Sequence, residues 1–161
     1  MSLHIRWMIR RDLPEVLQIE KASFEDGWKE EDFLVALRQV NCIGNVAEIG
    51  EKIVGFFLWE MQQGFLKITN FAIDPNYRRQ GIGKAMIQKL FTKLQENRNR
   101  ITMMVKESNL PAQLFFKTMG FECTGIKKRF YREENEDGYL FQIVIPMGIP
   151  MEPVLESSES L

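Results

Sequence analysis

The sequence predicts a single mixed α/β domain, and three observations support this fold class. The chain has 161 residues, which is enough for one domain with its own core but few for two. Between residues 42 and 73, three apolar, aromatic-rich runs are separated by short turns, as in an antiparallel meander. After this meander, apolar residues recur at helical spacing from position 82 to 94. No linker divides these segments, so we expect one domain over residues 1–147.

A strand and two helices are expected before the meander. Residues 5–10 form the first expected strand. Asp12 is expected to cap a helix that begins at Leu13, because an aspartate carboxylate accepts hydrogen bonds from the free N–H groups of a first turn. Pro14 is compatible with that first turn. The next apolar residues at helical spacing predict a second helix: Phe33, Leu34 and Leu37.

The meander is expected to comprise strands at residues 42–49, 53–61 and 65–73, followed by the amphipathic helix at 82–94 and a short buried strand at 101–105. The last third of the chain predicts a helix at 110–119, with Ser108 or Asn109 as its cap, and two strands at 122–128 and 139–145.

The composition argues against several classes of protein. The 21 Lys and Arg side chains balance 22 Asp and Glu, so the overall charge favours neither nucleic acid nor an anionic membrane surface. Two distant cysteines and one histidine do not predict a metal site. No apolar run approaches the roughly 18 residues of a membrane-spanning helix, and no signal peptide is recognised at the start. We expect a cytoplasmic protein without a membrane or nucleic-acid partner, and an acidic, flexible tail at residues 148–161.

The charges are nevertheless unevenly distributed. Residues 12–35 contain eight acids and two bases, whereas residues 75–106 contain eight bases and one acid. Charged runs of this kind usually form solvated helix faces. The basic segment would also suit a polyanionic ligand, and the acidic segment a cationic one.

The clearest local motif is Arg78-Arg79-Gln80-Gly81-Ile82-Gly83-Lys84, which follows an expected strand and opens the amphipathic helix. Glycine lets the backbone turn tightly and approach a ligand closely. The first N–H groups of a helix lack internal partners and lie at the positive end of its dipole, so they bind phosphate well. The spacing is neither that of a Walker A loop nor that of a complete dinucleotide fingerprint. We therefore predict a pyrophosphate-binding turn.

The order of the elements resembles the GNAT superfamily of N-acetyltransferases over residues 5–147. Four stretches carry the resemblance: FAIDPNYRRQGIG at 71–83, ESN at 107–109, FFKTMGF at 115–121, and FEDGW followed by Phe33 at 24–33. The last of these, together with RFY at 129–131, is similar to the RimI-like protein N-terminal acetyltransferases.

The resemblance implies a GNAT-like fold, in which a mixed, mostly antiparallel seven-stranded sheet is flanked by about four helices and splays into a V between strands four and five. In this family the acetyl-CoA pyrophosphate lies on the turn. Pantetheine pairs with the preceding strand, where a backbone N–H stabilises the tetrahedral oxyanion. The residues implied to bind acetyl-CoA are Phe71, Ala72, Ile73, Arg78, Arg79, Gln80, Gly81, Ile82, Gly83, Lys84, Asn109, Ala112, Phe115 and Phe116.

The sequence departs from the family at the two positions that move protons. RimI-like enzymes have a Glu on the strand after the long helix and a Tyr on the next helix. Met104 and Phe116 occupy these positions, and neither side chain can transfer a proton. In their place, Glu60 is the leading candidate base and Tyr131 the candidate acid. The other groups considered as base or water ligand are Glu107, Thr69 and Asn70.

Three interpretations of this departure stay open. Another group supplies the base, or the acceptor is an α-amine, whose pKa of about 7.7–8.0 leaves part of it neutral. In the third interpretation, the protein is an acyl-CoA-binding sensor without catalysis. The leading expectation is acetyl transfer to a protein or peptide N-terminal amine, with Trp28 and Tyr131 lining the acceptor site. A polyamine, amino acid or aminoglycoside is the alternative acceptor, and the protein is expected to be a monomer or homodimer without a metal.

Overall fold

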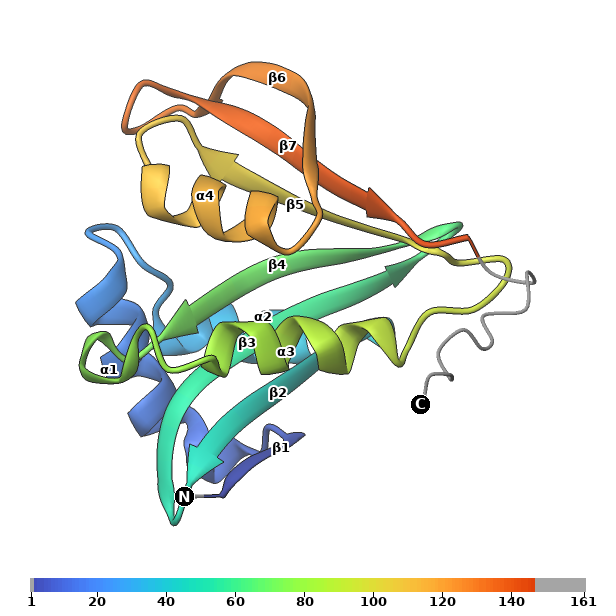
Figure 1. Cartoon of the computed structure of the whole chain (residues 1–161). Helices are drawn as coiled ribbons and strands as arrows, with labels where there is room; N and C mark the ends of the chain where they lie inside the picture. Colours follow the sequence, from blue (N-terminus) through green and yellow to red (C-terminus); the bar gives the residue numbers. More distant parts are fainter. Residues whose placement is uncertain (1, 147–161) are drawn as a thin grey trace.

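A computed structural model describes residues 2–146, which form one seven-stranded sheet with helices on both faces (Figure 1). The strands are β1 (Leu3–Trp7), β2 (Cys42–Ile49), β3 (Lys52–Gln62), β4 (Phe65–Ile73), β5 (Arg100–Lys106), β6 (Glu122–Tyr131) and β7 (Glu136–Val144). The helices are α1 (Leu13–Ser23), α2 (Glu30–Leu37), α3 (Ile82–Phe91) and α4 (Leu110–Thr118), with 3₁₀ turns η1 (Arg10–Asp12) and η2 (Pro75–Tyr77). The expected tail at 148–161 lies outside the described residues.

The sheet splits in its middle, as the family resemblance implies. The strand order is β1-β2-β3-β4-β5-β7-β6, and all neighbouring pairs are antiparallel except β4 and β5. This parallel pair joins only Phe65–Ile68 to residues 100–103. Beyond that point β4 and β5 diverge (Figure 1), and β5 continues to pair with β7 up to Lys106. The expected V between strands four and five is confirmed.

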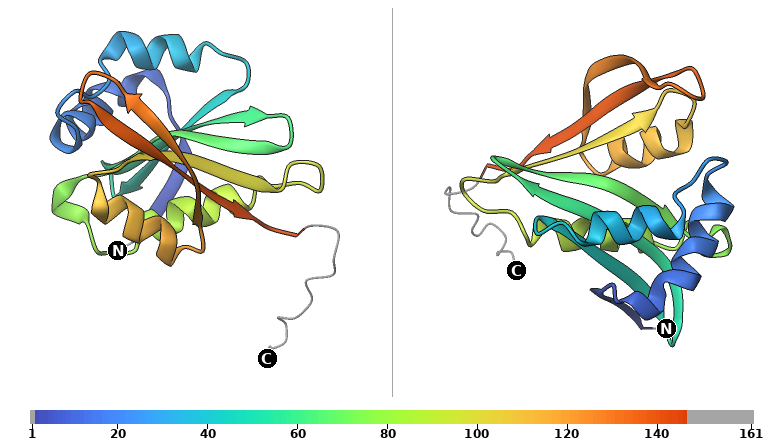
Figure 2. Two further views of the ribbon diagram at one scale, coloured as in Figure 1. Left: turned by 90° about the horizontal axis from the view of Figure 1, so that it is seen from above. Right: turned by 180° about the vertical axis from the view of Figure 1, so that it is seen from behind.

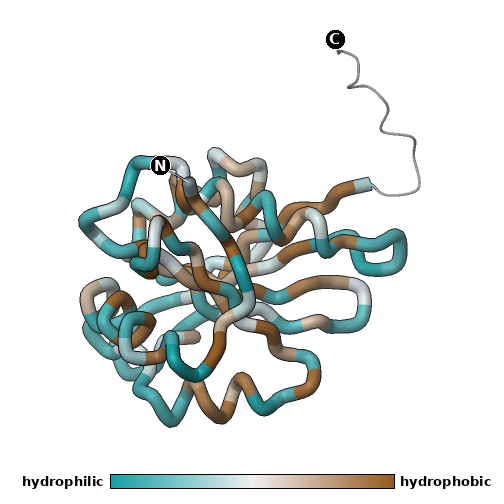
Figure 3. Tube along the Cα trace, turned by 90° about the horizontal axis from the view of Figure 1, so that it is seen from below, coloured by the Kyte–Doolittle hydropathy of each residue, from teal (hydrophilic) through white to brown (hydrophobic). Residues whose placement is uncertain are grey.

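Two apolar cores lie on opposite faces of the sheet, because successive side chains of a strand point to opposite sides. One core packs α3 and the aromatic residues of α4 against the sheet, and the other packs α1 and α2 against it. Figure 2 shows these two helical layers from above and from behind. In Figure 3 the hydrophobic stretches run through the strands and helices, and the peripheral loops are mostly hydrophilic. Within residues 2–146, no helix combines the length and apolar character needed to cross a membrane.

Several element boundaries differ from the expected ones. The first strand covers residues 3–7 rather than 5–10, because the chain turns into η1 at Arg10. Helix α3 ends at Phe91 rather than at residue 94. A tight turn follows Phe91, in which the Lys93 N–H donates to Leu90 O at 2.9 Å. Strands β6 and β7 are longer than expected and leave only a short connection between them.

Asp12 flanks α1 as expected, but its side chain does not cap that helix. The carboxylate instead accepts two hydrogen bonds from the Arg6 guanidinium, at 2.8 and 2.9 Å, and one from the Ile9 N–H at 2.8 Å. Burial raises the pKa of Asp12, but the bonds from Arg6 and Ile9 outweigh this effect and hold the pKa below its usual value. The carboxylate therefore fastens β1 to the start of α1.

Replacing Asp12 with Asn is expected to lower the free energy of unfolding by about 2–3 kcal/mol at pH 7, because the half-buried Arg6 guanidinium loses its charged partner. Since the native pKa lies below the unfolded value, the stabilisation is present above about pH 4 and is lost as the pH falls. Urea unfolding of the wild type and of Asp12→Asn at pH 7 and pH 3 measures this loss of stability. If the difference in unfolding free energy between the two proteins does not shrink at pH 3, the expectation is wrong. Asp32→Asn, at the exposed start of α2, is the control.

Candidate functional site

The loop between β4 and α3 has the geometry of an anion-binding turn. Asp74 begins it, since its Oδ1 accepts the Asn76 N–H at 2.9 Å. Arg79 and Gly81 then have φ values of 62° and 83°, in the left-handed region that favours glycine. The first backbone hydrogen bond of α3 runs from Ala85 N–H to Gly81 O at 3.1 Å. The turn therefore leads directly into a helix N-terminus.

The backbone N–H groups of residues 79–84 have no hydrogen-bond acceptor within the described part of the chain. They lie at the positive end of α3, and the exposed Arg79 and Lys84 add two cationic side chains there. Alternation of left- and right-handed residues makes such N–H groups converge on an anion. Arg78 differs from its neighbours, because it donates to Ile73 O at 3.2 Å and to Ser23 Oγ at 3.3 Å. It therefore joins β4 to α1 and holds the turn in place.

The unpaired part of β4 lies beside an aromatic wall from α4. The Phe71 ring is 5.7 Å from the Phe115 ring and 5.5 Å from the Phe116 ring. Phe115 is half-buried, whereas Phe116 is 1% exposed and supports the wall from behind. A Cβ on Gly83 would lie 3.0 Å from side-chain atoms of Phe115 and Ile73. The start of α3 thus packs directly onto the wall, and the predicted cofactor-binding segments converge.

Asn109 caps α4, as one of the two sequence alternatives predicted. Its Oδ1 accepts the Ala112 N–H at 3.2 Å. Because this bond uses only the oxygen, the side-chain NH₂ group is left without an acceptor within residues 2–146. Asn109 can therefore cap the helix and donate to a ligand at the same time.

Met104 and Tyr131 meet where β5 leaves β4. Met104 is the first residue of β5 beyond the last β4–β5 pair, and its carbonyl accepts the Tyr131 hydroxyl at 3.2 Å. Burial, followed by the charges of Glu134 and Glu136, raises the pKa of Tyr131 to about 12. The phenol therefore stays protonated at neutral pH. Lys106 Nζ lies 5.3 Å from the centre of the Tyr131 ring.

Glu60 and Glu107 already have partners. Glu107 Oε1 accepts the Asp137 N–H at 2.7 Å, which ties β5 to the β6–β7 hairpin. Glu60 Oε1 accepts a hydrogen bond from the Gln62 side-chain NH₂ at 2.8 Å. In the sheet, Glu60 on β3 is opposite Lys67 on β4, and Lys67 immediately precedes Ile68, the last β4 residue that pairs with β5. Burial and then the Glu60 charge raise the pKa of the Cys42 thiol to about 11. Glu60 thus lies in the joined half of the sheet, next to the start of the split.

Glu20 is a buried acid that the sequence analysis did not single out. It is 3% exposed, and its Oε2 accepts the Trp28 N–H at 2.9 Å. Its Oε1 has no partner in the described structure, and burial raises its pKa. The signal was present in the sequence, since Glu20 follows Leu13 and Val16 on the apolar stripe of α1. A charged residue on a buried stripe needs a specific partner.

Asn70 is a second buried acceptor on the same face of the sheet. It is 7% exposed, and its Oδ1 has no hydrogen-bond partner within residues 2–146. Its neighbour Ala72 on that face belongs to the core beneath α1 and α2, as does Phe33, onto which the Trp28 ring packs edge-on at 5.2 Å. In the described residues no group of three His, Cys, Asp or Glu side chains is arranged to hold a metal.

Comparison with known proteins agrees with this geometry. The model of the acetyltransferase (GNAT) family matches residues 13–121. A Bacillus subtilis protein provisionally named a ribosomal protein bS18-alanine N-acetyltransferase is 30% identical over 145 residues, covering 88% of this chain and 95% of its own. An N-alpha-acetyltransferase of Sulfurisphaera tokodaii is 26% identical, covering 80% and 85%.

The fold is also similar to solved structures. The crystal structure of the ribosomal-protein-S18-alanine N-acetyltransferase from Escherichia coli superposes with a TM-score of 0.80 at 23% identity, over 91% of this chain and 96% of that one. The family model covers more than half of the chain, and its span includes the anion-binding turn, the split strands and the aromatic wall. The chain therefore belongs to the acetyltransferase (GNAT) family.

Proposed function

We propose that this protein transfers an acetyl group from acetyl-CoA to the N-terminal α-amine of a polypeptide. The observation that carries the proposal is the run of unpaired N–H groups at residues 79–84, which follows the part of β4 that has separated from β5. This arrangement fits a ligand with a pyrophosphate at one end and an extended amide-containing arm at the other. The names of the relatives from B. subtilis and S. tokodaii support an N-terminal acceptor.

The chain's own residues divide the work of holding acetyl-CoA. The N–H groups of residues 79–84 would bind the pyrophosphate, and the unpaired edge of Phe71–Ile73 would pair with the pantetheine amides. The free NH₂ of Asn109 would donate to the same arm, and Ala112 and Phe115 would exclude water from it. When bound, acetyl-CoA supplies an acetyl group activated as a thioester. A backbone N–H of β4 that points into the split would stabilise negative charge on its carbonyl oxygen.

The acceptor side offers two buried oxygens that lack donors. Glu20 belongs to α1, and Asn70 lies on the face of the sheet that α1 and α2 cover. An amine has N–H donors to satisfy such acceptors, and burial makes an unsatisfied acceptor costly. Trp28, whose N–H binds the other Glu20 oxygen, would form one wall of the acceptor site.

Proton transfer need not involve a strong base in this protein. Met104 and Phe116 stand at the two positions that carry Glu and Tyr in RimI-like enzymes, and Phe116 is buried. An α-amine with a pKa of about 7.7–8.0 is partly neutral at neutral pH, so positioning can supply most of the rate. Glu60 stays the candidate base if one is needed.

Tyr131→Phe is expected to lower kcat less than about tenfold. Burial raises the pKa of Tyr131 to about 12, which makes its hydroxyl a poorer proton donor to a thiolate than an ordinary tyrosine. The hydroxyl therefore acts by holding β6 onto the Met104 carbonyl. Steady-state kinetics of thiol release measure this effect. A loss of kcat of about 100-fold or more would be typical of a general acid and would overturn the structural role given to the Tyr131 hydroxyl.

Calorimetric titration with acetyl-CoA, followed by thiol release with peptides and small amines, tests the proposed function. Binding and turnover with N-terminal peptides support it. Turnover only with a polyamine, amino acid or aminoglycoside would identify the alternative acceptor class. Binding of acetyl-CoA without turnover on any amine would support a non-catalytic acyl-CoA sensor. Met104 and Phe116, which cannot transfer protons, would then explain the lack of catalysis. No binding at all would reject all three.

A further inference from the structure

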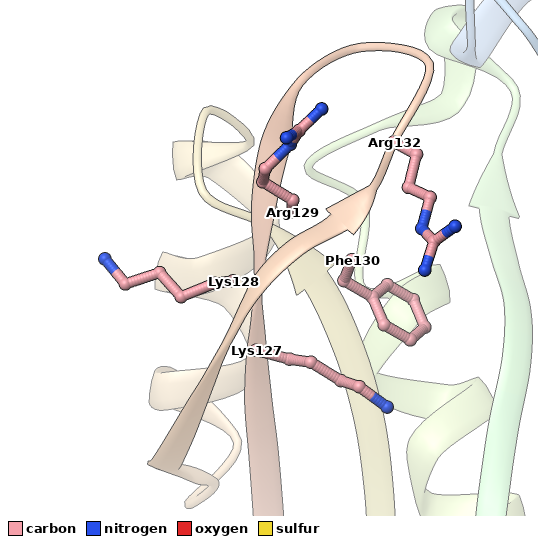
Figure 4. A pocket seen from close by; sticks show the side chains of 5 residues that line it. All are labelled: Lys127, Lys128, Arg129, Phe130 and Arg132. Carbon is pink, nitrogen blue, oxygen red and sulfur yellow. The ribbon is translucent and has the colours of Figure 1, made fainter.

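The β6–β7 hairpin contains a basic cavity that lies outside the acetyl-CoA site. Its volume is about 470 Å³, and its lining consists of Lys127, Lys128, Arg129, Phe130 and Arg132. Figure 4 shows Lys127, Phe130 and Arg132 extending to the same side of the hairpin, while Lys128 points the opposite way. Four of the five lining residues are therefore basic.

Most acids near this cavity already have partners. Glu134 Oε2 is 3.2 Å from Lys106 Nζ, and Glu136 Oε1 accepts the Ser108 N–H at 3.0 Å. Asp137 accepts the Arg129 N–H at 2.8 Å and lies 3.6 Å from Lys128 Nζ. The nearby carboxylates thus fix the hairpin, and among the basic groups of the cavity they neutralise only Lys128.

Three cationic groups remain without an acidic partner in the described part of the chain, namely Lys127 and the guanidinium groups of Arg129 and Arg132. Lys127 Nζ instead lies 5.5 Å from the centre of the Phe130 ring. Two acids of the hairpin also lack an ion pair in the described structure: Glu133 at its exposed tip, and Glu136, which accepts only the uncharged Ser108 N–H. The cavity lining therefore presents three unpaired cations, against two unpaired carboxylates on the same hairpin.

The cavity adjoins the place where the split opens on the acceptor side. A Cβ on Gly138 would lie 2.9 Å from Phe130 Cβ and 2.8 Å from Met104 Cγ, so these two side chains flank the same glycine. The Phe130 and Tyr131 rings are 5.0 Å apart, and the Tyr131 hydroxyl binds the Met104 carbonyl. Phe130, which lines the cavity, thus lies next to Tyr131. Tyr131 in turn contacts Met104, the first β5 residue beyond the last β4–β5 pair.

We propose that this cavity binds the carboxylate of an Asp or Glu at the second to fourth residue of the acceptor polypeptide. The inference rests on the proposed function. An extended peptide advances about 3.3 Å per residue, so a side chain a few residues from the reacting amine reaches a cavity that borders Met104. Arginine and lysine recognise carboxylates by charge-assisted hydrogen bonds. Glu133, Glu134 and Glu136 border the same hairpin and would repel a polyanion such as RNA more than a single carboxylate.

Three peptides that differ only at residues two to four test the preference. One carries Glu, one Gln and one Lys at these positions. We expect kcat/KM for the Glu peptide to exceed that for the Gln peptide by about fivefold to tenfold, as one or two exposed ion pairs would give. The Lys peptide should be poorer than both, and the preference should shrink as salt rises.

Lys127→Gln combined with Arg132→Gln is expected to bring the ratio of Glu to Gln peptide close to one without changing the affinity for acetyl-CoA. Arg10→Gln, an exposed base in η1 just before α1, is a surface control and should keep the preference. Equal kcat/KM for the Glu and Gln peptides in the wild type would overturn the inference and leave the proposed function standing.

Peptide affinity in the presence of CoA, measured by fluorescence anisotropy, gives a readout that does not depend on turnover. If no peptide is acetylated, the proposed function fails. The cavity is then judged by whether the Glu peptide binds more tightly than the Gln peptide and loses this advantage in the double variant. Displacement of the Glu peptide by a single-stranded oligonucleotide, but not by a second acidic peptide, would assign the cavity to nucleic acid and overturn the inference.

Discussion

Gly81→Glu is expected to weaken acetyl-CoA binding by about 100-fold or more, equivalent to about 2.8 kcal/mol. The new carboxylate would lie at the N-terminus of α3, where the unpaired N–H groups of residues 79–84 would hold a pyrophosphate. It would repel the phosphates and compete for the same donors. Calorimetric titration with acetyl-CoA measures the loss.

Gly64→Glu provides a closely matched control. Gly64 has φ 89° and Gly81 has φ 83°, and a Cβ at either position would meet no atom within 4 Å. Both variants therefore carry the same added charge and a similar backbone strain of about 1–2 kcal/mol. Gly64 lies in the turn between β3 and β4, at the other end of β4 from the anion-binding turn. Equal loss of affinity in both, or in neither, would contradict the assignment of the turn.

The second large effect is a preference for α-amines over lysine side chains of about 300-fold at pH 7.5. An α-amine with a pKa near 7.8 is about one-third neutral at that pH, whereas an ε-amine with a pKa near 10.4 is about 0.1% neutral. Because Met104 and Phe116 cannot remove a proton from the amine, we expect the difference in neutral fraction to appear directly in kcat/KM. We expect kcat/KM to rise with pH and to level off above about pH 8.

Two peptides of one sequence measure this preference. The first has a free N-terminus and no lysine, and the second has a blocked N-terminus and one internal lysine. Comparable rates for both would mean that the protein supplies a strong base. Glu60→Gln then identifies it, since loss of that base would lower kcat at pH 7 with partial recovery at higher pH. An unchanged profile in Glu60→Gln would remove Glu60 from consideration.

The conformation of the turn between β4 and α3 is the part of the candidate site that the sequence predicted best. Its properties are local, because left-handed residues, the first N–H groups of a helix and the charges of Arg79 and Lys84 all come from one stretch of chain. The cap at Asn109 was predictable for the same reason. The expected role of Asp12 was wrong because its carboxylate is taken by Arg6 on β1, and this contact depends on how the strand and helix pack.

The acceptor side was less predictable, because its features join segments that are far apart in the chain. Tyr131 OH meets the Met104 carbonyl across 27 residues, and the pKa of Tyr131 follows from burial at that contact. The unpartnered oxygens of Glu20 and Asn70 can be identified only when every neighbour is known. A sequence motif indicates that a residue type is present but not whether its hydrogen bonds are satisfied.

By itself, the sequence determined the order of the elements, the tight turn that leads into α3 and the presence of Met and Phe at positions 104 and 116, since each is a property of residue type or short-range spacing. Only the tertiary structure decided where β4 and β5 part, which acids near the β6–β7 hairpin are already paired, and which bases of its cavity are not. The physical reason is that strand pairing, burial and charge compensation depend on contacts between distant segments.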